Sequence, residues 1–186
     1  MSELHEELRA LYDELRGKMR SDWSRDLPLE ELLFDRWERA KSLGFGDGSS
    51  IYHNSYVFGD VQVGRNTWIG PFTMLDGSGG LSIGEGCSIS TGVQIYSHDT
   101  VRWAVSGGKL PAERAPVAIG DFTYIGSQTV VSKGVTIGDH VVVGACSFVN
   151  RDIPPYTIAV GVPCRAIGTV EVGQDADVRL VYGGRG

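Results

Sequence analysis

The amino-acid sequence predicts an all-β fold, a parallel β-solenoid of short strands with a helical segment before it and a protruding loop. Three observations predict the solenoid: with two interruptions, an aliphatic residue recurs at every sixth position, glycine often follows it, and a small or β-branched residue often lies two positions before it. A period of six fits neither an amphipathic helix nor a half-buried strand, whereas it fits a solenoid in which each hexad is one strand and one turn. The aliphatic positions are Ile51, Val57, Val63, Ile69, Leu75, Ile83, Ile89, Ile95, Val101, Ile119, Ile125, Val131, Ile137, Val143 and Val149.

Three hexads close a triangular coil of about 18 residues, and stacked coils pair their strands in parallel about 4.8 Å apart. The aliphatic side chains then point into the prism, and glycine at the corners adopts backbone angles that other residues resist. Each coil buries its aliphatic residues only against its neighbours, so several coils are needed. The pattern predicts about five coils within residues 46–168.

Residues 1–45 are predicted to form two helices ahead of the solenoid, and residues 169–186 a C-terminal tail. The first helix is expected over residues 2–20, where leucines recur at helical spacing, and the second over residues 27–43, with Asp26 as its cap. We expect a packed appendage, with a contact to another subunit or to a substrate as the alternative. The leucines are Leu4, Leu8, Leu11 and Leu15.

The composition bounds the class of protein. The chain's 186 residues are the usual length of one domain with a small appendage, and a hydrophobic content of 41% is enough for a core. A net charge of −6 gives no general reason to bind nucleic acid or anionic lipid. No apolar run of about 18 residues predicts a membrane span, and the charged N-terminus lacks the apolar centre of a signal peptide. Cys87, Cys146 and Cys164 show no CxxC spacing, which favours reduced thiols and a cytoplasmic location.

One long stretch, RWAVSGGKLPAERAP at residues 102–116, interrupts the hexads. A loop that leaves a regular solenoid is often functional, with a tolerated insertion as the alternative. His98 lies at the threshold of this loop, three residues after the inward-facing Ile95, so its side chain should face outward. An imidazole accepts a proton near neutral pH, which makes His98 a candidate general base.

Residues 51–168 resemble the hexapeptide-repeat acyltransferases, whose fold is the left-handed parallel β-helix. The resemblance is carried by IGDFTYIGSQTVVSKGVTIGDHVVVGACSFVNRDIPPYTIAVGVPCRAIG and, before the interruption, by LDGSGGLSIGEGCSISTGVQIYSH. Both stretches are similar to galactoside and maltose-type sugar O-acetyltransferases. The resemblance implies a homotrimer that transfers an acetyl group from acetyl-CoA, without a metal, to a sugar or glycan precursor in polysaccharide biosynthesis. It also implies active sites between neighbouring prisms.

The resemblance assigns His98 as the general base that takes the proton of the acceptor hydroxyl during a direct transfer. A backbone N–H of a neighbouring coil is expected to stabilise the oxyanion. The family's histidine lies slightly further along the chain and is followed by proline, whereas Asp99 follows His98 here. Asp99 is a candidate to orient the imidazole, and His140 is the alternative base.

Further contacts are implied for the acceptor and for coenzyme A. Asp76, in the stretch MLDG, and Glu113, in the loop, match acceptor contacts, with a turn carboxylate as the alternative for Asp76. Guanidinium groups suit phosphate oxygens because their N–H groups form a planar fork. The positions that match contacts with the pantetheine arm are Tyr124, Ser127 and Ala145, and those that match contacts with the phosphates are Arg151 and Arg165.

Other functions stay open on the sequence. An amino-sugar N-acetyltransferase and a xenobiotic or antibiotic acetyltransferase share the repeat, and a non-catalytic β-helix would serve as an assembly subunit. A zinc site like that of the γ-type carbonic anhydrases is not expected. His53, His98 and His140 are 45 and 42 residues apart, and no closely spaced pair of histidines is present.

Overall fold

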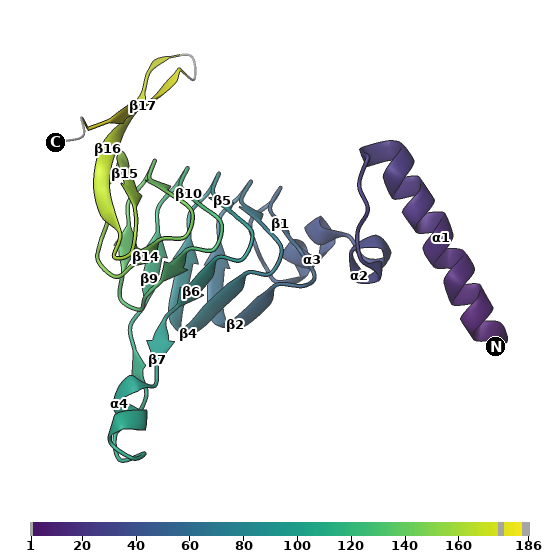
Figure 1. Ribbon diagram of the computed structural model, residues 1–186, viewed down its shortest axis with the longest axis horizontal. Coiled ribbons are helices and arrows are strands. Elements are labelled where there is room, and N and C mark those ends of the chain that lie inside the picture. The colour runs from purple at the N-terminus through teal and green to yellow at the C-terminus, as the bar shows by residue number, and fades with distance from the viewer. Residues whose placement is uncertain (1, 175–176, 184–186) are drawn as a thin grey trace.

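The computed structural model describes residues 2–174 and 177–183 and shows a helical segment, a coiled β-structure, a protruding arm and a terminal hairpin (Figure 1). The helices are α1 (Glu3–Trp23), α2 (Leu29–Leu33), α3 (Arg36–Ser42) and α4 (Val101–Val105). The strands are β1 (Ser50–Ile51), β2 (Tyr56–Val63), β3 (Trp68–Ile69), β4 (Met74–Ile83), β5 (Ser88–Ile89), β6 (Gln94–Tyr96), β7 (His98–Asp99), β8 (Glu113–Arg114), β9 (Val117–Ile119), β10 (Tyr124–Ile125), β11 (Val130–Val131), β12 (Thr136–Ile137), β13 (Val142–Val143), β14 (Phe148–Val149), β15 (Thr157–Val160), β16 (Arg165–Val172) and β17 (Val178–Tyr182).

The coils form a prism with three faces. Face 1 consists of β1, β3, β5, β10, β13 and β15, in that order and all parallel. Face 2 consists of the early parts of β2 and β4, followed by β6, β11 and β14. Face 3 consists of the late parts of β2 and β4, followed by β9 and β12. The predicted parallel solenoid is therefore confirmed, and its corners lie where the chain passes from one face to the next.

The strand register of face 1 measures the length of each coil. Ile51 pairs with Ile69, which gives a step of 18 residues. The next step, from Ile69 to Ile89, is 20 residues because two extra residues lie within β4. The following step, from Ile89 to Ile125, is 36 residues because the arm is inserted there. The register returns to 18 residues between Ile125 and Val143. Insertions therefore lengthen a coil without shifting the stack.

The core of the prism is a column of aliphatic side chains and a ladder of small ones. The buried aliphatic residues include Ile51, Ile69, Leu75, Ile89, Ile95, Ile125, Val131, Ile137, Val143 and Val149. The residues two positions before them supply hydroxyl groups to the next coil: Thr67 Oγ1 donates to Gly84 O at 2.8 Å, and Thr123 Oγ1 donates to Gly138 O at 2.9 Å. The preference for threonine and serine at these positions thus has a hydrogen-bonding reason, because a buried hydroxyl without a partner is costly.

One predicted core position is wrong. Val101 has 61% of its surface exposed and begins α4 instead of pointing into the prism. The chain leaves the coil before that position, and Ile119, which is 3% exposed, fills the third face after the arm. At the other end, Ala159 adds a sixth strand to face 1, beyond the predicted stack of about five coils.

The helices α2 and α3 cover the open N-terminal end of the prism. Ala40 and Phe45 are buried there. Glu31 Oε1 accepts hydrogen bonds from the backbone N–H groups of His53, at 2.6 Å, and Asn54, at 3.2 Å. Arg39 donates to the carbonyl groups of Tyr52 and Ser55. These bonds satisfy backbone groups of the first coil that have no further coil to pair with. The expected second helix is split in two because the Asp35 side chain caps α3 by accepting from Trp37 N and Glu38 N.

Helix α1 stands apart from the prism and contacts α2 within the helical segment (Figure 1). No residue of α1 is buried, and Leu4, Leu8 and Leu11 are 64%, 51% and 40% exposed. The helix stands apart from the coils at the end of the molecule that carries the N-terminus (Figure 1). Asp26 forms ion pairs with Arg16 and Arg20 instead of capping the second helix.

The C-terminal end of the prism is closed by antiparallel strands. β15 pairs with β16, and β16 pairs with β17, so the described part of the expected tail extends face 1 as a hairpin. Residues 175–176 and 184–186 of that tail lie outside the described residues. Within the described chain, no helix has both the length and the apolar character needed to cross a membrane.

We expect Ile95→Ala to lower the free energy of unfolding by about 2–5 kcal/mol, because the side chain is fully buried and its removal leaves a cavity. Val101→Ala is the matched control at a position of the same predicted pattern, and its effect should stay within about 0.5 kcal/mol because the side chain is exposed. Denaturant-induced unfolding of both variants measures the difference. Equal losses for the two variants would contradict the placement of Val101 outside the core.

Candidate functional site

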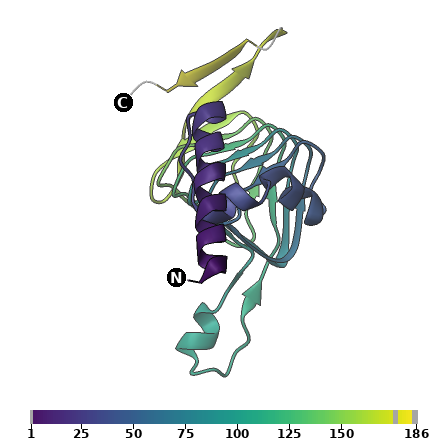
Figure 2. The same ribbon diagram turned by 90° about the vertical axis from the view of Figure 1, so that its right-hand side faces the viewer.

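The arm leaves the prism at the corner between face 2 and face 3. Its base is a two-stranded antiparallel ribbon in which His98 lies opposite Arg114, and Asp99 lies opposite Glu113. Helix α4 lies at its outer part, and the arm projects from one corner of the coils when the molecule is viewed along the prism (Figure 2). The predicted protruding loop is therefore confirmed, and the ribbon at its base fixes the backbone of His98.

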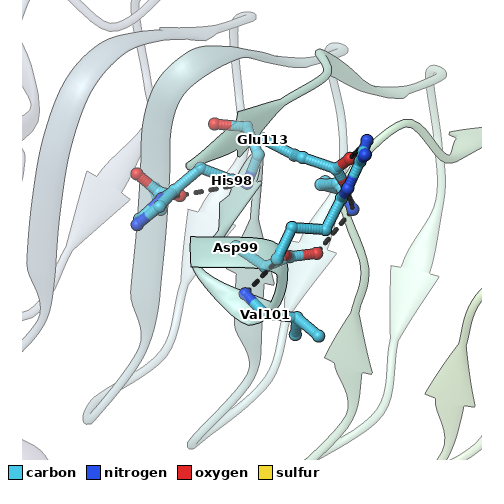
Figure 3. Close-up of polar contacts among 8 residues, drawn as sticks. His98, Asp99, Val101 and Glu113 are labelled. Carbon is cyan, nitrogen blue, oxygen red and sulfur yellow. Dashed lines mark hydrogen bonds and ion pairs between the residues drawn. The ribbon is translucent and has the colours of Figure 1, made fainter. Parts of the chain in front are cut away.

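The imidazole of His98 contacts the carboxylate of Asp76, which belongs to the preceding coil. His98 Nδ1 lies 2.5 Å from Asp76 Oδ2 (Figure 3). The Asp76 side chain is 3% exposed, whereas the His98 side chain is 35% exposed. The two residues meet because β4 and β6 are paired, with Asp76 directly opposite Tyr96. A buried carboxylate thus holds an accessible imidazole at the foot of the arm.

Asp76 is held as a carboxylate by a set of hydrogen bonds. Its Oδ1 accepts from the Ser78 N–H at 3.0 Å and from Ser78 Oγ at 2.5 Å, and its Oδ2 accepts from the Ser97 N–H at 3.1 Å. Burial by itself would raise the pKa of Asp76, but the hydrogen bonds from Ser78, His98 and Ser97 outweigh burial and lower that pKa to about 2. At neutral pH the carboxylate can only accept hydrogen bonds, so Nδ1 of His98 must be the donor. The lone pair of the neutral ring then lies on Nε2.

This contact changes the interpretation of two carboxylates. Asp76, which is predicted to contact the acceptor, orients the imidazole through Nδ1, and its contact with an acceptor stays a prediction. The assignment of the orienting role to Asp99 is wrong. The Asp99 side chain contacts Lys133 Nζ at 2.5 Å and accepts from the Val101 N–H at 3.0 Å (Figure 3).

Lys133 and Arg102 complete an ion-pair network at the base of the arm. Lys133 Nζ lies 3.2 Å from Glu113 Oε2, and Arg102 Nη1 lies 2.9 Å from Glu113 Oε1. Hydrogen bonding to Lys133 lowers the pKa of Asp99, and hydrogen bonds from Arg102 and then Lys133 lower the pKa of Glu113. Both carboxylates therefore carry charge at neutral pH and bind the arm to the next coil.

Lys133 was not recognisable as part of the site from the sequence. It lies in the turn after β11, 34 residues beyond Asp99, and only the coil stacking brings the two together. Glu113 is engaged in this network, and its predicted contact with an acceptor stays a prediction. The spacing of coil corners is the one signal that could have pointed to Lys133.

The predicted coenzyme A residues divide between two corners of the prism. Ser127 and Ala145 lie in successive turns between face 1 and face 2, where the Cys146 N–H donates to Ser127 O at 2.8 Å. Tyr124 lies beside this corner on face 1 and is 43% exposed. Arg151 follows β14 and lies at the other corner of face 2, the corner that also carries His98.

Arg165 begins β16, where its side chain donates to Cys164 O.

Within one chain, face 2 separates the turns of Ser127 and Ala145 from His98. One extended hexad spans on the order of 15–20 Å at roughly 3.3 Å per residue. The structure thus brings Asp76, His98 and Glu113 to one corner but leaves the predicted pantetheine contacts at another.

The histidines do not gather. The His140 ring stacks between Phe122 and Tyr156, with ring centroids 5.1 and 4.9 Å apart, and His53 lies beside Phe34 at the helical end. Within residues 2–174 and 177–183, no three histidine, cysteine, aspartate or glutamate side chains group so as to hold a metal ion.

The repeat matches a known family. Residues 116–151 match the family model described as Bacterial transferase hexapeptide (six repeats). A galactoside O-acetyltransferase from Escherichia coli (strain K12) is 33% identical over 127 residues, which are 58% of this chain and 63% of the relative. The chain therefore spans slightly less than two thirds of the length of that relative.

Solved structures agree with the fold. A galactoside acetyltransferase in complex with coenzyme A aligns with a TM-score of 0.63 at 26% identity and covers 91% of this chain and 85% of that one. A mutant of AntD, an N-acyltransferase from Bacillus cereus, in complex with dTDP and coenzyme A, aligns with a TM-score of 0.60 at 24% identity over 71% of this chain and 88% of that one. The second likeness shows the fold alone.

These likenesses define the class of protein as a left-handed parallel β-helix, as predicted. Residues 116–151 carry the repeat of the bacterial hexapeptide transferases, and the chain is similar to members of that family. Within it, the chain is similar to galactoside acetyltransferases in both sequence and structure.

We expect Asp76→Asn to remove a pH-dependent contribution to stability. The pKa of this carboxylate is about 2 in the folded chain against an ordinary value of 3.8, so its contribution is fully present above about pH 4 and is lost as the pH falls through about 2. At pH 6 the contribution is on the order of 2 kcal/mol. The difference in unfolding free energy between wild type and Asp76→Asn should therefore shrink between pH 6 and pH 2.5.

Asp60→Asn, which changes an exposed carboxylate on β2, is the control for this measurement. Its difference from wild type should stay nearly constant over the same range. A pH-independent difference for Asp76→Asn would contradict the depressed pKa of Asp76.

Proposed function

We propose that this protein is an acetyl-CoA-dependent O-acetyltransferase that acts on a hydroxyl group of a sugar or glycan precursor. The observation that carries the proposal is the pair of His98 and Asp76 at the foot of the arm, in which Nδ1 is bound to Asp76 and Nε2 forms no hydrogen bond with the described residues. The similarity to galactoside acetyltransferases, one of them in complex with coenzyme A, supports the donor and the class of acceptor.

The chemistry follows from this pair. A neutral hydroxyl is a weak nucleophile toward a thioester, so it needs a base at the moment of attack. The acceptor oxygen forms a bond to the carbonyl carbon of acetyl-CoA while its proton passes to Nε2 of His98. The Asp76 carboxylate stabilises the imidazolium because it accepts the Nδ1 hydrogen bond. The tetrahedral intermediate then loses the C–S bond, and the proton on Nε2 goes to the thiolate, which gives the acetyl ester and free coenzyme A.

The proposed donor site uses the corner between face 1 and face 2. Ser127 and Ala145 expose the backbone of successive turns there, which suits the amide groups of the pantetheine arm. Tyr124 lies beside the same corner and is proposed to contact the arm. Arg165, which lies further toward the C-terminal end, is proposed to contact the phosphates. Arg151 lies at the His98 corner and is proposed to contact the phosphates of the donor bound to the neighbouring copy.

A complete site requires two copies of the chain in this proposal. Reaction needs the hydroxyl and the thioester carbon within about 3–3.5 Å of each other. His98 and the donor corner lie at opposite edges of face 2, so the donor corner of one copy must face the His98 corner of the next. A contact between two different edges forms a closed ring when the rotation between copies closes, and a rotation of one third of a turn, which the triangular prism suits, gives a ring of three. We therefore propose a homotrimer.

The product distinguishes O-transfer, which forms an acetyl ester, from N-transfer, which forms an acetamide. Nε2 of His98 can accept a proton from either a hydroxyl or an amine. An acceptor screen that follows free thiol release from acetyl-CoA identifies active acceptors. Their products then distinguish the two reactions, because acetyl esters are cleaved by mild hydroxylamine whereas acetamides persist.

We expect His98→Ala to reduce kcat by about two to four orders of magnitude. The fold should persist because the side chain faces outward and is 35% exposed. Thiol release measures activity, and circular dichroism measures the fold. His140→Ala is the matched control, since His140 stacks between two aromatic rings away from the arm. Near-normal turnover of His98→Ala, with loss in His140→Ala, would move the base to His140.

We expect two inactive variants to restore each other's activity when they assemble together. His98→Ala removes the base, and Ala145→Trp places a ring in the exposed turn of the donor corner. A mixed ring contains a site with His98 from one copy and an unblocked donor corner from another. Co-expression should therefore recover a substantial fraction of wild-type activity. No recovery in mixed assemblies, or full activity in a species with the mass of one 20.1 kDa chain, would defeat the shared site.

A further inference from the structure

A groove runs along the corner between face 1 and face 2, from the helical end of the prism to the turn of Ser127. It has a volume of about 430 Å³. Its floor is formed by face 1 and the adjoining turns, including Ser88 and Ser90 on either side of the buried Ile89. The end of the groove away from Ser127 is formed by residues of the helical segment. We call it the Trp68 groove.

Aromatic rings line the part of the Trp68 groove near the helices. Trp68 is 64% exposed, and Trp37 is 46% exposed. Tyr52 lies between the first coil and α3 and completes the set. Exposed tryptophan rings in a groove offer flat apolar faces on which sugar rings stack, and the hydroxyl groups of the floor offer hydrogen-bond donors and acceptors.

The charge of the groove is positive although the chain as a whole is negative. Arg25 and Arg36 line it, and no aspartate or glutamate does, in a chain of net charge −6. Among the described residues, neither arginine forms an ion pair with a carboxylate.

The Arg36 guanidinium is nevertheless fixed in place. Its carbon lies 4.2 Å from the centre of the Trp37 ring and 5.1 Å from that of Tyr52, and Nη1 donates to Tyr52 Oη at 2.8 Å. Four N–H groups of a guanidinium held in this way remain for an anion.

The position of the groove along the prism indicates which substrate would occupy it. His98 belongs to the coil of β5 and β6. The proposed donor contacts at Ala145 and Arg165 lie in later coils, whereas Trp68 and Tyr52 lie in earlier ones. A donor that arrives from the C-terminal end leaves the N-terminal side of the thioester open. An acceptor can approach from that side.

We infer that the Trp68 groove binds the acceptor and that this acceptor is an acidic saccharide, one whose ring stacks on Trp68 and whose carboxylate or phosphate pairs with Arg36. The inference rests on the proposed acetyl transfer and extends it by naming the chemical class of the acceptor. Binding of the saccharide itself does not require turnover.

Direct binding tests the groove separately from catalysis. The probes are a uronic-acid tetrasaccharide, a sugar nucleotide that carries the acid as phosphate, and a neutral tetrasaccharide of the same ring type. Isothermal calorimetry should show that at least one acidic probe binds more tightly than the neutral one. Arg36→Gln should weaken that probe about 10- to 100-fold, the range for a lost charged hydrogen bond, and Trp68→Ala should weaken both acidic and neutral probes.

Matched variants control for unfolding and for general charge. Arg65→Gln removes an arginine that lies outside the groove beside Glu85, and it should leave binding unchanged. Tyr52→Phe removes the hydrogen bond that holds Arg36 but keeps the ring and the charge, so it should weaken the acidic probe by less than Arg36→Gln.

Kinetics then separate the acceptor from the donor. With an active acceptor, Arg36→Gln should raise the KM for the acceptor and leave the KM for acetyl-CoA within about twofold. The inference is overturned if the neutral probe binds as well as both acidic ones, if no probe binds in a groove-dependent way, if the acetyl-CoA KM rises instead, or if Trp68→Ala changes the mass of the assembly. If an acidic probe binds in a groove-dependent way but no thiol is released, the Trp68 groove stands as a saccharide site and the proposed acetyl transfer is overturned.

Discussion

Each coil of the β-helix has aliphatic side chains to bury and can bury them only against the coils on either side. The stack must therefore keep its register, and Ile51, Ile69, Ile89, Ile125 and Val143 pair in one continuous ladder although the chain between them varies in length. Extra residues can leave the stack only at a place where they do not displace an inward side chain. The arm emerges at such a place, the corner between faces 2 and 3, and its exit point decides where the imidazole lies.

The same stacking assembles the site from residues that are distant in sequence. Asp76, His98 and Lys133 come from three successive coils and meet at one corner. Hydrogen bonds from Ser78 and Ser97 keep the buried Asp76 ionised, and the ionised carboxylate selects the tautomer of His98. The charged network then holds the arm to the prism. Because contacts within the chain hold His98, the position of this base does not depend on the acceptor.

A prism has separate corners, and this geometry shapes the proposed function. The His98 corner and the donor corner flank face 2, so each copy offers two different half-sites. A ring of copies would bring unlike corners together and exclude water from the space between them. The Trp68 groove reaches the donor corner at Ser127, which would place the acceptor and the thioester in the same cleft. The helical end of the chain would in this proposal distinguish one acceptor from another.

The sequence by itself determined the solenoid, because a six-residue period in Ile and Val is a local signal that few other folds can satisfy. It also determined the place of the arm and singled out His98, since an interruption is visible against a strict repeat. Only the tertiary structure decided that Asp76 rather than Asp99 orients the imidazole, that Val101 leaves the core, and that Lys133 binds Glu113. These contacts join different coils, and the direction of a side chain at a corner depends on turn geometry that the repeat does not encode. The exposure of α1 could not be predicted from the sequence either, because helical periodicity indicates an apolar stripe and not the surface that covers it.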